Sequence, residues 1–156
     1  MDQTNPSATL PDFARGIAVF LLIICISLFS FWGYQWVNYL LSQSFNVETG
    51  STMYDLFIGL IAMFSSVLIV IGIWLVWHMR SASVAFLAAG GIGFLIKNVL
   101  DIINDVNPLQ TLAVVTKYDI QRVAGNIGFD LLQVAFWIFV LVYFLRSSFR
   151  NTLVQN

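Results

Sequence analysis

Residues 54–79 read YDLFIGLIAMFSSVLIVIGIWLVWHM and decide the fold class. The stretch carries one acidic residue, Asp55, at its start and no lysine or arginine. A membrane-spanning helix needs about 20 consecutive apolar residues, so this stretch predicts a transmembrane helix. Trp74 and Trp77 mark one end, as aromatic residues do at a membrane interface. His78, the only histidine, is expected at the same interface because no further metal ligand accompanies it.

Three further apolar stretches resemble this one in length. They are residues 16–41, 83–104 and 123–145. Each is long enough to cross a hydrocarbon core of about 30 Å. Residues 1–156 therefore predict a single domain, an all-α polytopic membrane protein built as an antiparallel bundle of four transmembrane helices. Residues 105–122 are expected to connect the last two helices as a loop, with a turn at Pro108 and a short, weakly amphipathic interfacial segment at 109–115.

Composition agrees with a membrane protein and excludes other classes. The chain is 59% hydrophobic and 10% charged, whereas about a quarter of the residues are charged in a typical soluble domain. A soluble domain of this length would not bury that much apolar surface, so the lipid bilayer is the expected partner. The net charge of −1 and the lack of a basic patch argue against nucleic acid. Cys25, the only cysteine, is expected to be a small buried apolar residue.

The basic residues predict an orientation. Two sets flank the helices, four on one side and two on the other: Arg15, Arg80, Arg146 and Arg150, and Lys117 and Arg122. Cytoplasmic loops carry the excess of lysine and arginine, so both termini are expected in the cytoplasm. The first helix lacks the basic segment and cleavage site of a signal peptide, and we expect it to remain as a membrane helix.

Small residues recur at helical spacing on the third and fourth helices. Ala89 and Gly93 are four residues apart, as are Ala124 and Gly128. Such pairs let two helix backbones approach closely in lipid. We interpret these faces first as surfaces on which helices pack; the alternative for the third helix is a thin wall beside a cavity.

Polar residues of a kind that is rare in hydrocarbon gather on the same two helices. They are Lys97, Asn98, Asp101, Asn126, Asp130 and Gln133. Lys97 and Asp101 are four residues apart and share a helix face. Lys97 and Asp130 each lie about seven residues from the outer ends of their helices, roughly 10 Å deep at ~1.5 Å per residue. Gln35 and Asn38 of the first helix are expected at the outer depth, and Asp55 at the outer start of the second helix.

A charge in hydrocarbon costs several kcal/mol and normally faces the bundle interior or water. We therefore expect a shared polar pocket in the outer leaflet, with Lys97 bonded to Asp130, to Asp101 or to both. Three interpretations are open. The cluster is a buried ion pair that fixes helix register, a solvated vestibule for a small ligand, ion or proton, or a docking surface for a partner's membrane helix. The long Lys97 side chain can also extend to the interface, which would shrink the pocket.

The stretch VYFLRSSFRNTLV, residues 142–154, resembles a known family. It is similar to the C-terminal signature of bacterial family 2569 of the domains of unknown function, whose last helix runs into Tyr-Phe-Leu, then Ser, basic residues and Asn-Thr. The matching positions are Tyr143, Phe144, Leu145, Ser147, Arg150, Asn151 and Thr152. Val140 and Val142 stand where the family has tryptophan and proline. The resemblance implies a four-helix protein of the bacterial inner membrane, and it implies no activity.

No catalytic or cofactor-binding pattern accompanies the polar cluster. The sequence shows no Ser-His-Asp set, no metal-ligand spacing and no phosphate-binding glycine loop, so we expect a non-enzymatic protein without cofactor or metal. Our first hypothesis is an accessory or assembly partner of a membrane complex, in contact with another membrane protein or a second copy. The alternative is a small transporter or ligand-binding membrane module that uses the outer-leaflet pocket.

Overall fold

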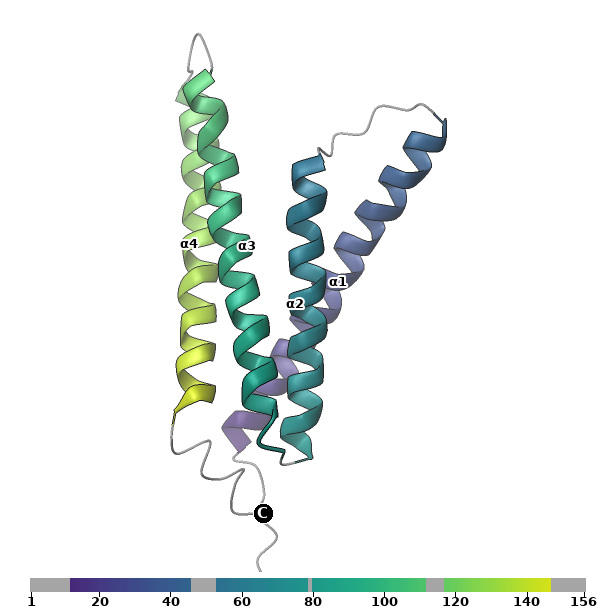
Figure 1. The fold of residues 1–156 in the computed structure, drawn as a ribbon. Coiled ribbons are helices and arrows are strands. Elements are labelled where there is room, and N and C mark those ends of the chain that lie inside the picture. The colour runs from purple at the N-terminus through teal and green to yellow at the C-terminus, as the bar shows by residue number, and fades with distance from the viewer. Residues whose placement is uncertain (1–11, 46–52, 79, 112–116, 147–156) are drawn as a thin grey trace, which may run out of the picture.

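The computed structural model describes residues 12–45, 53–78, 80–111 and 117–146. These residues form four α-helices and no strand. The helices are α1 (Asp12–Phe45), α2 (Met53–Trp77), α3 (Ser83–Thr111) and α4 (Lys117–Leu145). Successive helices run in opposite directions (Figure 1). The predicted all-α bundle of four antiparallel helices is confirmed.

Each helix is long and apolar enough to cross a membrane. The candidate spans are Phe13–Ser42, Tyr54–Trp77, Ser83–Val106 and Ile120–Leu145. Large apolar side chains face outward on every helix, among them Phe20, Phe64, Ile96 and Leu132. Water would penalise such a surface and lipid would not, so the chain is an integral membrane protein.

The connection between α3 and α4 is shorter than the sequence predicts. The expected loop covered residues 105–122, but α3 continues to Thr111 and α4 already begins at Lys117. The expected turn at Pro108 is wrong. The missing N–H of a proline removes one backbone hydrogen bond, a loss that membrane helices tolerate. Residues 112–115 of the expected interfacial segment lie outside the described residues.

The α2–α3 connection is short, as the expected spans 54–79 and 83–104 imply. The backbone N–H of Arg80 donates to the carbonyl of Leu75 at 2.9 Å, and that of Ser83 donates to the carbonyl of Arg80 at 3.0 Å. His78 lies exposed at the end of α2, where its Nδ1 is 2.8 Å from the carbonyl oxygen of Trp74. These local hydrogen bonds satisfy the backbone as the chain reverses.

The helices pack in the order of the chain, with α2 against α1 and α3, and α3 against α4. Helix α1 crosses α2 obliquely, and its C-terminal half departs from the other helices (Figure 1). Near its start α1 meets α4, where the rings of Phe13 and Tyr143 pack edge to face with centroids 5.5 Å apart. We call the end where α1 begins and α4 ends the proximal end, and the opposite end the distal end.

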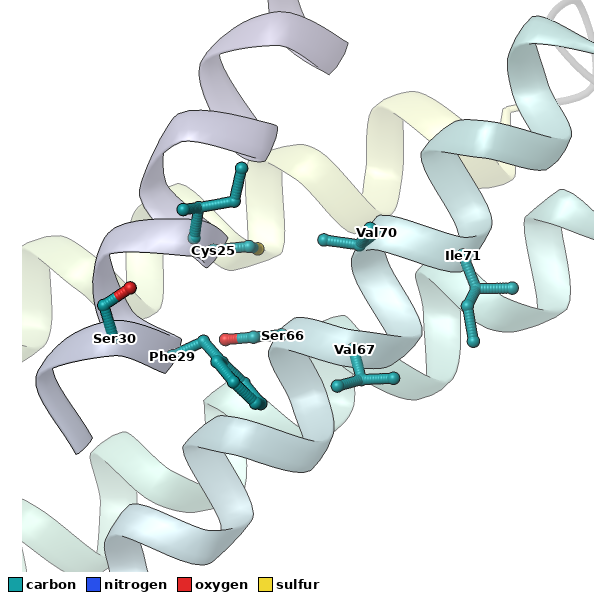
Figure 2. A pocket seen from close by; sticks show the side chains of 8 residues that line it. Cys25, Phe29, Ser30, Ser66, Val67, Val70 and Ile71 are labelled. Carbon is teal, nitrogen blue, oxygen red and sulfur yellow. The ribbon is translucent and has the colours of Figure 1, made fainter. Parts of the chain in front are cut away.

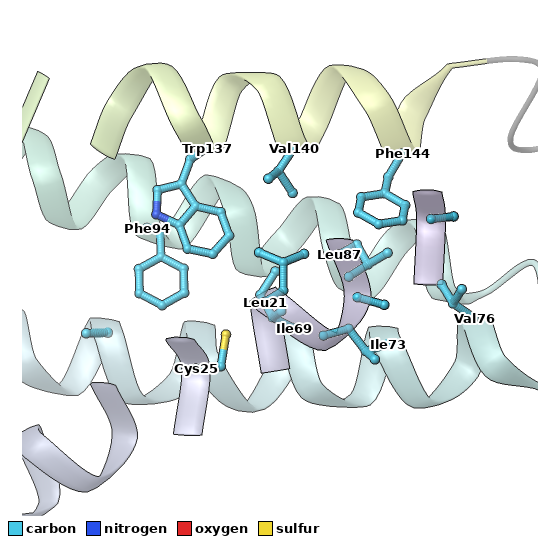
Figure 3. Packing of buried hydrophobic residues seen from close by; sticks show 13 residues of the cluster. Leu21, Cys25, Ile69, Ile73, Val76, Leu87, Phe94, Trp137, Val140 and Phe144 are labelled. Atoms are coloured by element: carbon cyan, nitrogen blue, oxygen red, sulfur yellow. The ribbon is translucent and has the colours of Figure 1, made fainter. Parts of the chain in front are cut away.

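The apolar core joins all the helices between the proximal end and the middle of the bundle. Leu21 and Cys25 of α1 belong to the same buried cluster as Ile69 of α2 (Figure 3). The rings of Phe94 on α3 and Trp137 on α4 stack almost parallel, with centroids 4.2 Å apart. Cys25 is buried and free, as predicted.

Glycine sets the distance between α2 and α3. A Cβ atom at Gly90 would lie 2.9 Å from the backbone oxygen of Ser65 and 2.7 Å from the side chain of Ile69. A Cβ at Gly93 would collide with the Ser65 hydroxyl. Only glycine therefore lets the two backbones come this close.

The small-residue pairs that the sequence singled out are not the ones that make this contact. Ala89, Ala124 and Gly128 are exposed, and nothing lies within 4 Å of a Cβ built at Gly128. The expected Ala89–Gly93 packing face is wrong by one residue, because the contacting pair is Gly90 and Gly93. Spacing alone did not determine which face of the helix turns inward.

Candidate functional site

An acidic pocket lies at the distal end, among α2, α3 and α4. Its volume is about 260 Å³. The residues that line it are Asp55, Asp101, Asn104, Asp105, Asn126, Phe129 and Asp130. Four of them are carboxylates and two are amides, so the pocket offers mainly oxygen and nitrogen atoms to a ligand.

Helical spacing brings these side chains to one place. Asp101 and Asp105 are four residues apart on α3 and therefore share a face. Asn126 and Asp130 have the same spacing on the antiparallel α4. Asp55 lies in the first turn of α2, where the helix dipole favours a carboxylate. The pocket thus forms where the end of α3 meets the starts of α2 and α4.

Lys97 pairs with a carboxylate of its own helix. It forms an ion pair with Asp101, and its Nζ donates a hydrogen bond to Oδ1 of Asn98 at 3.3 Å. Lys97 and Asn98 are both buried. Of the two acidic partners that the sequence offered, the structure gives Asp101. Because this ion pair lies within α3, it does not by itself fix the register of α3 against α4.

Two amides connect the helices around the pocket. Nδ2 of Asn104 on α3 donates to Oδ1 of Asp55 on α2 at 3.3 Å. Nδ2 of Asn126 on α4 donates to Oδ1 of Asp105 on α3 at 3.4 Å. A carboxylate only accepts hydrogen bonds, so each amide turns its NH₂ group toward the acid and keeps its carbonyl oxygen as an acceptor. These two hydrogen bonds join α3 to α2 and α4 to α3. They are therefore contacts between helices that can fix the register of one helix against another.

Asp130 differs from the other carboxylates. Its side chain lines the pocket, and the residue is 6% exposed. None of the hydrogen bonds or ion pairs formed by the described residues reaches its carboxylate. The charged groups that act on it from a distance are Asp101, Lys97 and Asp105, two of which repel it. Burial of an unpaired carboxylate is costly.

Five of the eight residues that the sequence singled out lie at this site. Asp101, Asn126 and Asp130 line the pocket, and Lys97 and Asn98 form the adjoining cluster with Asp101. This grouping follows from the spacing on two antiparallel helices.

The other three candidates do not line the pocket. Gln35 and Asn38 lie in the distal half of α1, which departs from the other helices (Figure 1). Gln133 lies on α4 one turn deeper than Asp130 and is half-buried. Because α1 packs mainly on α2, it adds no side chain to the lining.

Sequence reasoning overlooked three lining residues: Asn104, Asp105 and Phe129. Asp55, which the sequence places at the outer start of the second helix, also lies on the lining. A signal for Asp105 was present, since it repeats the four-residue spacing of Lys97 and Asp101. It was assigned to a loop because α3 was expected to end at Asn104. The extra helical turns at the end of α3 bring it onto the pocket wall.

A second hollow, which we call the apolar groove, lies between α1 and α2. Its volume is about 250 Å³, and it is lined by Cys25, Ile26, Phe29, Ser30, Ser66, Val67, Val70 and Ile71. Cys25 and Ser66 face each other across it (Figure 2). The Ser66 hydroxyl donates to the carbonyl of Ala62 on its own helix at 2.8 Å. The groove therefore presents almost only apolar surface.

Metal ligation finds no support among the described residues. No group of three or more His, Cys, Asp or Glu side chains in them is arranged to hold a metal ion. The carboxylates of the acidic pocket thus surround a space instead of converging on one point.

Four apolar spans with an acidic pocket among three of them define a polytopic α-helical membrane protein. No family model, curated protein or solved structure matches the chain. The resemblance of residues 142–154 to family 2569 stays a prediction, and residues 147–154 of this stretch lie outside the described residues.

Proposed function

We propose that this protein is a non-enzymatic membrane protein that binds a cationic group in the acidic pocket. The observation that carries the proposal is the carboxylate of Asp130, which is 6% exposed, lines the pocket and has no partner among the described residues. An ionisable residue inside a membrane span is costly and usually serves a function. A bound cation would supply the missing partner.

The charge around the pocket supports the same function. Four aspartates line it. Among the described residues, Lys97 forms an ion pair with one of them, Asp101. Asp101 and Asp105 repel the charge of Asp130, and Lys97 attracts it. Like charges repel more strongly at low dielectric than in water, so a cation in the pocket would relieve this repulsion and an anion would add to it.

The proposed location follows from the basic residues. We place the protein in a bacterial inner membrane with both termini in the cytoplasm, in agreement with the positive-inside rule and with the resemblance of the C-terminal stretch. The acidic pocket then lies in the outer leaflet, and its ligand would come from outside the cell.

Cation binding can be tested on the full-length protein in phosphatidylcholine nanodiscs. Thermal unfolding is followed by tryptophan fluorescence while potassium, magnesium or alkylammonium chloride is added. A ligand that binds the folded state stabilises it by mass action, by about 2.7 kcal/mol at a hundred times its Kd. We expect a saturable rise in Tm with at least one cation, and its loss in Asp130→Asn.

Ser66→Ala in the apolar groove is the matched control and should keep the rise in Tm. A rise that is equal in the wild type and Asp130→Asn would contradict the proposal. So would the absence of saturable stabilisation by every cation tested.

A second candidate function is that of an accessory subunit that contacts a partner's membrane helix. The observation that favours it is the exposed pair of Ala124 and Gly128, because nothing in the described structure lies within 4 Å of a Cβ built at Gly128. A helix backbone can approach such a pair closely. The partner would therefore present an apolar helix with a small-residue face.

Native mass spectrometry from a mild detergent tests this second function. We expect one companion polypeptide, which Gly128→Leu should release. Gly16→Leu is the control, since Gly16 on α1 also has nothing within 4 Å of a built Cβ. A lone monomer would contradict the accessory role, and a complex with a second copy would replace the partner by a homo-oligomer.

A further inference from the structure

The shape of the acidic pocket favours a small molecule over a metal ion that three or more of its carboxylates would hold directly. Ca²⁺ and Mg²⁺ need several oxygen ligands at about 2.0–2.6 Å, and no group of three acidic side chains among the described residues converges in that way. The volume of about 260 Å³ falls just below the range of about 300–1,000 Å³ that is common for ligand pockets. The pocket therefore fits a ligand of few atoms.

Lys97 shows how this site holds an ammonium group. Its Nζ contacts the carboxylate of Asp101 and the amide oxygen of Asn98 at 3.3 Å. One carboxylate and one neutral oxygen thus bind a buried ammonium. This combination neutralises the charge and accepts two of the three N–H bonds.

Helix α4 offers a second set of the same kind. Asp130 and Asn126 lie four residues apart on one face and both line the pocket. The Asn126 NH₂ group donates to Asp105, which leaves its carbonyl oxygen as an acceptor. Phe129 lies beside them on the lining, and an aromatic face attracts a cation as well as apolar carbon.

We propose that the acidic pocket binds a small organic ammonium ion. Its N–H groups bond to the carboxylate of Asp130 and the amide oxygen of Asn126, and its carbon atoms lie against Phe129. This inference rests on the proposed function, since it names the class of the cation.

The side chain of Lys97 then carries the same kind of ammonium group as the ligand, but this group is covalently attached to α3. It acts electrostatically on Asp130 while paired with Asp101, and so it lowers the negative potential that a free ammonium ion meets. Removal of its charge strengthens the attraction of the pocket for a cation. Lys97 therefore tunes the affinity of the site without being a ligand contact.

Isothermal titration calorimetry on the full-length protein in phosphatidylcholine nanodiscs tests the ligand class. The probes are propylammonium, tetramethylammonium, potassium and magnesium chloride. We expect saturable binding of propylammonium. Tetramethylammonium carries the same charge without N–H donors, and we expect it to bind about tenfold more weakly, the effect typical of hydrogen bonds to a charged group.

Variants assign the contacts. Asp130→Asn should weaken propylammonium binding at least tenfold, and Asn126→Leu should weaken it several-fold. Lys97→Met should strengthen it several-fold, whereas Lys97→Arg keeps the tethered charge and should leave the affinity near that of the wild type. Circular dichroism of each variant shows whether it is folded. If Asp130→Asn does not fold, the other two variants still test the proposal, because the affinity for propylammonium should fall in Asn126→Leu and rise in Lys97→Met.

The outcomes separate this inference from the proposed function. Saturable, Asp130-dependent binding of potassium or magnesium alone would leave the proposed function standing and overturn the ammonium class. Equal affinity for tetramethylammonium and propylammonium would overturn the hydrogen-bonding argument. No binding of any probe would overturn both. An unchanged affinity in Lys97→Met would contradict the role of Lys97.

Discussion

The acidic pocket and the apolar groove have almost the same volume, about 260 and 250 Å³. They differ in whether a lipid chain can satisfy the atoms that line them. A lipid chain can fill the groove at little cost, because the hydroxyl of Ser66 already bonds within its own helix. No lipid chain can satisfy the carboxylate of Asp130 in the pocket. In a membrane protein the unsatisfied polarity of a hollow, more than its size, therefore marks a candidate binding site.

Helix packing accounts for the two environments. The groove lies where α1 crosses α2 obliquely, and apolar side chains form most of its walls. The pocket lies where hydrogen bonds tie α2 to α3 and α3 to α4. Interhelical hydrogen bonds in membranes contribute modestly, about 0.6 kcal/mol on average, but they hold the distal helix ends in place around the charges.

The largest expected effect comes from removal of the acid that pairs with Lys97. Asp101→Leu should lower the free energy of unfolding in detergent by about 3–5 kcal/mol, because it leaves a buried ammonium without its carboxylate. The double variant Lys97→Met with Asp101→Leu should recover most of the loss. Thermal unfolding of both, compared as a double-mutant cycle, measures the coupling.

The cycle of Lys97 with Asp130 is the control, and its coupling should be smaller. A loss below about 1 kcal/mol in Asp101→Leu would contradict the assignment. It would show that Lys97 reaches another carboxylate, with Asp130 as the candidate.

A smaller effect is expected from a change in how α2, the helix that lines both the pocket and the groove, packs on α3. Helix α2 borders both, and Gly90 sets its distance from α3, since a Cβ there would meet the Ser65 backbone. Gly90→Ala should destabilise by about 1–3 kcal/mol through overpacking. Gly128→Ala, with open space around the new Cβ, should be neutral or slightly stabilising. Equal effects on the unfolding temperature would contradict the close approach of α2 and α3.

The unpaired carboxylate should cost stability. Asp130→Asn replaces a buried charge by a neutral group of the same shape, and we expect it to stabilise the ligand-free protein by about 1 kcal/mol. Chemical unfolding in cation-poor detergent buffer measures this gain. A destabilised variant would mean that Asp130 has a partner in the folded protein, which favours a structural role over ligand binding.

The smallest effect is expected in the apolar groove. Ser66→Ala removes a hydroxyl that donates to the carbonyl of Ala62 on the same helix and contacts the thiol of Cys25 on α1. A thiol is a weak hydrogen-bond partner, so the change in unfolding free energy should stay within about 0.5 kcal/mol. A loss above about 1 kcal/mol in the same assay would show that the groove depends on this hydroxyl, and that the contrast with the pocket is less sharp.

Apolar length predicted the helices well, because a membrane span needs about 20 apolar residues and few other structures do. Spacing within one helix was equally informative. The ion pair of Lys97 and Asp101 follows from a separation of four residues on α3. Such properties depend only on the geometry of a single helix, which sequence determines directly.

The relative rotation of the helices was harder to predict. Gly90, and not Ala89, pairs with Gly93 against α2, and Gln35 and Asn38 of α1 stay away from the pocket. Lipid is as apolar as the bundle interior, so the apolar residues carry no inside-outside pattern that would orient a helix. The missed Asp105 has a different cause, since its helix continues past a proline.

The ion pair of Lys97 and Asp101 also bears on how the chain enters the membrane. A single Lys or Asp at the centre of an inserting helix costs about 2.5–3.5 kcal/mol. Both members of this pair lie on α3, so their charges can cancel as soon as that helix forms. The α4 stretch 123–145 holds no basic residue, so Asp130 enters without a neighbouring counter-charge. We therefore expect α3 to insert with its two charges already paired, and the insertion of α4 to depend more on helices that are already in the bilayer.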